Sequence, residues 1–124
     1  MKEAIIVADD SALIRNLISK KLSDEYIVLQ ASNGKEVIRL ITQNKQFKII
    51  GLILDLTMPE YDGFYVLEYY QKNNLFNKIP VAIISGDDSK STIDKAFKYP
   101  IVDLLNKPLS TENIKNIVDK MKMR

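Results

Sequence analysis

Two kinds of hydrophobic pattern alternate along the chain. Short runs of consecutive apolar residues are separated by longer stretches in which apolar residues recur every three or four positions, the spacing of one helix face. The strand-like runs are residues 4–8, 26–31, 49–54, 80–84 and 101–105. This alternation predicts five strands and five helices, because strands that pair in parallel need helical crossovers between them.

The helix-spaced stretches carry start signals of their own. Ser11 is well placed as the N-cap of the first helix, and Ser110 opens the last one. The third helix is expected to begin near Asp62 and Gly63. The apolar positions of the first helix are Leu13, Ile14, Leu17, Ile18 and Leu22, and those of the third helix that best face a sheet are Phe64, Leu67 and Tyr70.

Most of the strand-like runs are apolar throughout rather than alternating, which indicates a sheet covered by helices on both faces. Right-handed crossovers leave few topologies for such a chain. The flavodoxin-like strand order 2-1-3-4-5 suits five strands. We therefore expect an α/β protein with a flavodoxin-like, doubly wound, five-stranded parallel sheet and five helices.

The composition narrows the chemistry. The 124 residues include no cysteine and no histidine, so neither a thiolate metal site nor a histidine base is available. The net charge of +2 arises from 18 basic and 16 acidic residues spread along the chain, unlike the basic footprint of a nucleic-acid binder. The apolar runs are too short to span a membrane, and we expect no signal peptide before the first strand. We expect a cytoplasmic protein that contacts neither nucleic acid nor membrane.

Polar residues stand at the carboxyl ends of four predicted strands. Asp9 and Asp10 follow the first strand, Asp55 the third, Ser85 the fourth, and Lys107 the fifth. Any one of them alone would be read as a helix cap or a surface charge. In the predicted topology, however, these residues converge at the carboxyl ends of the strands, near the point where strand order reverses and ligands bind in such sheets. Three carboxylates need compensating positive charge, which Lys107 and a hard cation such as Mg²⁺ would supply, and a carboxylate such as Asp55 can act as a nucleophile.

This set of residues resembles the receiver domain of two-component response regulators, and the resemblance covers essentially the whole chain, residues 1–124. The residues that carry it are Asp9-Asp10, Asp55-Leu56-Thr57-Met58-Pro59, Asp62-Gly63, Ser85-Gly86 and Lys107-Pro108. The resemblance implies that Asp55 takes a phosphoryl group from a phosphohistidine on a sensor histidine kinase or phosphotransfer protein. It also implies that Lys107 and the Ser85 hydroxyl contact the phosphoryl oxygens.

Mg²⁺ is the cofactor that the resemblance implies. Asp10 would be a direct ligand and Asp9 would act through water, while Asp55 and the backbone carbonyl of Thr57 would complete the protein ligands. Thr57 and Asp87 occupy two positions that tune the phosphoaspartate lifetime in this family. The protein would then be a signalling module rather than an enzyme, although it would slowly remove its own phosphoryl group.

We expect a stand-alone receiver, similar to chemotaxis regulators, that signals through contacts with an unidentified downstream protein. One departure from the family concerns the switch residue, because Leu104 stands where the family has Tyr or Phe. We expect Leu104 to pack and the signal to pass through residues 86–99. The Lys107–Pro108 peptide, commonly cis in the family, is expected to be cis here.

Other interpretations stay open at this point. The chain would look the same as an N-terminal receiver of a longer regulator, or as a degenerate receiver that acts only as a protein-interaction module. A haloacid-dehalogenase-type phosphatase is disfavoured, because it needs a second Asp where this chain has Thr57. An FMN-binding flavodoxin is disfavoured because Asp9 and Asp10 would repel the phosphate.

Overall fold

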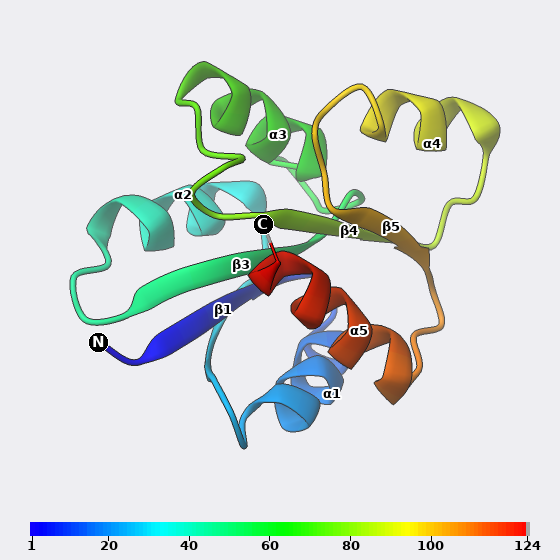
Figure 1. Cartoon of the computed structure of the whole chain (residues 1–124). Helices are drawn as coiled ribbons and strands as arrows, with labels where there is room; N and C mark the ends of the chain where they lie inside the picture. Colours follow the sequence, from blue (N-terminus) through cyan, green and yellow to red (C-terminus); the bar gives the residue numbers. More distant parts are fainter. Residues whose placement is uncertain (124) are drawn as a thin grey trace.

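Strands and helices alternate along residues 1–123, the part of the chain that the computed structural model describes (Figure 1). The strands are β1 (Glu3–Ala8), β2 (Ile27–Ala31), β3 (Lys48–Asp55), β4 (Val81–Ser85) and β5 (Asp103–Asn106). The helices are α1 (Ala12–Leu22), α2 (Gly34–Gln43), α3 (Gly63–Lys72), α4 (Lys90–Ala96) and α5 (Thr111–Lys122). The predicted alternation is confirmed, with strand ends displaced by one or two residues.

The strands form one sheet in the order β2-β1-β3-β4-β5, and every neighbouring pair is parallel. This is the predicted order, with the reversal of strand order between β1 and β3. Figure 1 shows α1 and α5 on one face of the sheet and α2, α3 and α4 on the other. None of the helices in the described residues has the length and apolar character that crossing a membrane requires.

A separate hydrophobic core lies on each face of the sheet. In β1, Ile6 and Ala8 point into the core beneath α2, α3 and α4, whereas Ile5 and Val7 point into the core beneath α1 and α5. Because successive residues of a strand point to opposite faces, both sets must be apolar when both faces are covered. This explains why the strands read as uninterrupted apolar runs.

Each helix of the described chain begins with a polar side chain that caps its first turn. The predicted caps are confirmed: Ser11 accepts a hydrogen bond from the Ile14 N–H, and Ser110 forms a reciprocal capping box with Asn113. The other caps are Asn33, Asp62 and Ser89. These side chains satisfy backbone N–H groups that have no partner inside the helix.

Two helix faces differ from the sequence pattern in detail. On α1, Leu13 and Leu17 are 69% and 50% exposed, because the buried stripe runs through Ile18 and Leu22 on the neighbouring face. On α3, Val66 is buried together with the predicted Leu67 and Tyr70. Phe64 is only half-buried, at the border of the core, where the Lys95 ammonium lies 4.0 Å from its ring centre.

Candidate functional site

The three predicted carboxylates meet at the carboxyl end of the sheet, where β1 and β3 lie side by side. Asp9 and Asp10 directly follow β1, and Asp55 is the last residue of β3. One oxygen atom from each carboxylate lies within 4.8 Å of the others. Asp9 and Asp55 are buried, whereas Asp10 is exposed to solvent. The cluster is therefore open on the side of Asp10.

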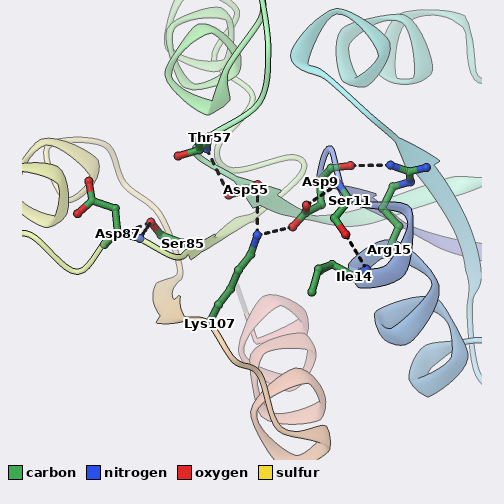
Figure 2. Close-up of polar contacts among 9 residues, drawn as sticks. All are labelled: Asp9, Ser11, Ile14, Arg15, Asp55, Thr57, Ser85, Asp87 and Lys107. Atoms are coloured by element: carbon green, nitrogen blue, oxygen red, sulfur yellow. Dashed lines mark hydrogen bonds and ion pairs between the residues drawn. The ribbon is translucent and has the colours of Figure 1, made fainter.

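Lys107 brings a positive charge to this cluster from the end of β5. Its ammonium nitrogen lies 2.8 Å from Oδ2 of Asp9 and 3.3 Å from Oδ2 of Asp55 (Figure 2). Its backbone N–H donates to the carbonyl of Ser85, and the Lys107–Pro108 peptide is cis, as expected. Burial alone would lower the pKa of Lys107, but its contacts with Asp9 and Asp55 raise the pKa overall. Lys107 is therefore held in its charged form.

The electrostatics of Asp55 are unfavourable for a carboxylate. Burial of the side chain, and then the charge of nearby Asp9, raise the pKa of Asp55 from 3.8 to about 6. The Lys107 ammonium and the Thr57 N–H, which donates to Oδ1 at 3.2 Å, oppose this rise only in part. Three carboxylates beside one ammonium leave the cluster short of positive charge. An open set of carboxylate oxygens lacking positive charge fits a hard divalent cation such as Mg²⁺.

Tight backbone packing shapes the loop that follows Asp55. The Gly63 N–H donates to the Leu56 carbonyl, which folds the start of α3 back against the end of β3. A Cβ atom on Gly63 would lie 2.7 Å from the Asp55 carbonyl oxygen and 2.8 Å from the Leu56 Cα. Only glycine fits there without backbone movement. The close approach of Gly63 to the backbone of Asp55 and Leu56 therefore explains why the Asp62-Gly63 motif has a glycine at this position.

Ser85 points away from the carboxylates in this structure. Its buried hydroxyl donates to the Asp87 carbonyl at 3.1 Å and accepts from the Asp87 N–H at 3.0 Å (Figure 2). The Asp87 carboxylate in turn accepts from the Ser89 N–H and the Thr92 hydroxyl, and these bonds, the Ser89 N–H first, lower the pKa of Asp87. Ser85 thus lies beside the site but is bonded to the β4–α4 connection.

Leu104, at the departure from the family pattern, is half-buried and packs against the core on the side of α2, α3 and α4. This agrees with the expectation that it packs like any other apolar residue.

One further residue at the site, Arg15 of α1, was not singled out from the sequence. Its guanidinium donates to the Asp9 carbonyl at 2.8 Å. The available signal was a basic residue five positions after Asp10, early in the helix that the acidic pair precedes.

Comparison with known proteins agrees with this geometry. A family model described as the response regulator receiver domain matches residues 5–119. The two-component response regulator ARR2 of Arabidopsis thaliana is 34% identical over 114 residues, which are 91% of this chain but 16% of that protein. The chemotaxis protein CheY1 of Helicobacter pylori is 29% identical over 113 residues, 90% of each chain.

Solved structures show the same fold. The receiver domain of the Francisella response regulator 1452 is 31% identical, with a TM-score of 0.81 and coverage of 97% of both chains. The chemotaxis response regulator CheY4 of Vibrio cholerae, at 22% identity, also has a TM-score of 0.81, with coverage of 98% of this chain and 99% of that one. The sheet order, the acidic cluster and these matches agree: the chain belongs to the receiver domain family of two-component response regulators.

Proposed function

We propose that residues 1–124 form one receiver domain that accepts a phosphoryl group on Asp55 from a phosphohistidine of a sensor histidine kinase or phosphotransfer protein. The observation that carries this proposal is the contact of one ammonium, that of Lys107, with both Asp55 and Asp9 inside a three-carboxylate cluster. This cluster is not an ordinary surface salt bridge, because Asp9 and Asp55 are buried. Removing buried charges from water is costly, which favours a functional reason for keeping them.

The transfer needs few protein groups. A carboxylate oxygen of Asp55 attacks phosphorus, the phosphorus–nitrogen bond of the donor breaks, and the imidazole nitrogen keeps the electron pair. An acyl phosphate forms on Asp55, a known role for carboxylate nucleophiles. Lys107, 3.3 Å from Asp55, is positioned to hold the transferred phosphoryl oxygens. Ser85 directly follows Ile84, the residue of β4 that pairs with Asp55. Its hydroxyl would join Lys107 after leaving the Asp87 carbonyl.

The proposed metal ligands are Asp9, Asp10, Asp55 and the backbone carbonyl of Thr57. Mg²⁺ bound there would supply positive charge to the phosphoryl oxygens and to the acidic cluster. Slow hydrolysis of the phosphoaspartate by water would return the domain to its starting state. We further propose that the protein acts in the cytoplasm and signals by binding a downstream protein.

The test is phosphorylation by a small donor. Wild-type protein incubated with acetyl phosphate and Mg²⁺ should gain the mass of one phosphoryl group, and mild base should remove it. The gain should be lost in Asp55→Asn and in the presence of a chelator. It should persist in Asp24→Asn, a matched change at an exposed carboxylate in the turn before β2. Equal labelling of Asp55→Asn, or no labelling of the wild type, would contradict the proposal.

A further inference from the structure

Arg15 contacts the backbone of the acidic cluster from outside it. We propose that Arg15 is a positioning residue: by binding the Asp9 carbonyl, it fixes the peptide that carries Asp10, and so sets the metal affinity of the site. This inference rests on the proposed function, in which Asp10 is a metal ligand. Within residues 1–123, the Arg15 side chain forms no hydrogen bond with Asp55 or Lys107, so its effect on the site would be indirect.

None of the residues that the structure describes holds the side chain of Asp10 directly. No hydrogen bond or ion pair reaches the Asp10 carboxylate from any described residue, and this side chain is exposed. Its position therefore follows from its backbone. The carbonyl of Asp9 belongs to the peptide plane shared by Asp9 and Asp10, and Arg15 Nη1 donates to that oxygen at 2.8 Å (Figure 2). The next peptide is held separately, because the Ser11 N–H donates to Oδ1 of Asp9 at 2.9 Å.

The Arg15 guanidinium is itself braced on its other side. Its Nε donates to Oε1 of Gln30 on the edge strand β2, at 3.0 Å. The amide nitrogen of Gln30 donates to Asn16 and Ser19 on α1, so the amide cannot turn without losing these bonds. Arginine can make both contacts at once because its planar group offers donors in fixed directions, which a lysine ammonium does not. The network ties the end of β1 to α1 and β2.

Positioning and simple charge make different demands on this residue. If only the positive charge mattered, a lysine at position 15 would serve as well, and Gln30 would be irrelevant. If positioning matters, the second bond and the rigid fork are needed. Loss of groups that orient metal ligands typically weakens metal binding by about 10–100-fold. We expect the lower end of this range, because Arg15 acts through the backbone.

The experiment measures Mn²⁺ binding to the metal-free protein, with free Mn²⁺ followed by electron paramagnetic resonance and Mg²⁺ used as competitor. Arg15→Met should weaken Mn²⁺ binding by about tenfold, and Arg15→Lys should fall between Arg15→Met and the wild type. Lys20→Met, which removes a positive charge from an exposed position of the same helix, should bind as the wild type does. Circular dichroism and urea unfolding without metal confirm that each variant is folded.

Gln30→Leu gives a second route if Arg15→Met does not fold, because it removes the brace while leaving the charge; its Mn²⁺ binding should weaken as well. The inference is overturned if Arg15→Met matches Lys20→Met, if Arg15→Lys matches the wild type, or if Gln30→Leu binds as tightly as the wild type. Failure of the proposed function is a separate result: the wild type would then bind no Mn²⁺, or Asp10→Asn would bind it equally well.

Discussion

Replacing Asp55 by asparagine should stabilise the metal-free protein. The folded state holds this carboxylate beside Asp9 and away from water, so its pKa rises from 3.8 to about 6. Each pKa unit corresponds to about 1.36 kcal/mol, so at pH 7.5 the ionised side chain lowers the free energy of unfolding by roughly 3 kcal/mol. Asparagine removes the charge and keeps an oxygen that can accept the Thr57 N–H, so most of that amount should be recovered.

The pH dependence has a definite sign. A carboxyl group whose pKa is raised on folding binds its proton more tightly in the native state, so its contribution to stability falls as pH rises from about 4 to 6. The gap between Asp55→Asn and the wild type should therefore shrink to about half at pH 5. Titratable groups far from Asp55, which the two proteins share, cancel in this difference.

The assay is urea unfolding in the presence of a chelator, followed by circular dichroism at pH 7.5 and pH 5. Asp24→Asn serves as the control and should change the free energy of unfolding by less than about 0.5 kcal/mol, because this carboxylate is exposed. The reasoning is refuted if Asp55→Asn is no more stable than the wild type at pH 7.5. It is also refuted if the gap stays constant between the two pH values.

Three further substitutions and one control test the fold by the same urea unfolding assay. Gly63→Ala places a Cβ atom 2.7 Å from the Asp55 carbonyl oxygen and should lower the free energy of unfolding by about 2 kcal/mol. Gly86→Ala is the control, because a Cβ atom there meets open space, and it should lower that free energy by less than about 0.5 kcal/mol. Equal effects would contradict the steric explanation. Tyr70→Phe removes a buried hydroxyl that has no partner among the described residues, so the free energy of unfolding should rise by about 1 kcal/mol, and a loss would show a hidden partner. Ser110→Ala removes the cap of α5 and should cost about 1 kcal/mol, unlike a neutral surface change.

A parallel sheet covered on both faces could be predicted from the sequence, because its strands are uninterrupted apolar runs. The strand order followed from the few topologies that right-handed crossovers allow. All residues of β1 from Ala4 to Ala8 are apolar, and all are fully buried. The convergence of Asp9, Asp55 and Lys107 followed from that topology, since the ends of parallel strands share one edge. The family resemblance added the assignment of roles, which the periodicity alone could not supply.

Other features could not be predicted because neighbouring helix faces carry similar residues. Leu13 and Leu17 have the same spacing as Ile14 and Ile18, and only the orientation of α1 on the sheet decides which pair faces the core. Arg15 donates to the backbone carbonyl of Asp9, and every residue type has such a carbonyl, so the sequence does not indicate this contact.

If Ser85 contacts the phosphoryl group as proposed, its single hydroxyl proton would make the response two-state. A serine hydroxyl has one hydrogen to donate, and here the Asp87 carbonyl receives it. If a phosphoryl oxygen on Asp55 took that hydrogen, the Asp87 carbonyl would have to give it up, so the two bonds exclude each other. A charged acceptor forms the stronger bond, by about twofold. In each molecule the Ser85 hydroxyl would then bond either the Asp87 carbonyl or the phosphoryl oxygen. An intermediate signal would therefore reflect a mixture of two populations.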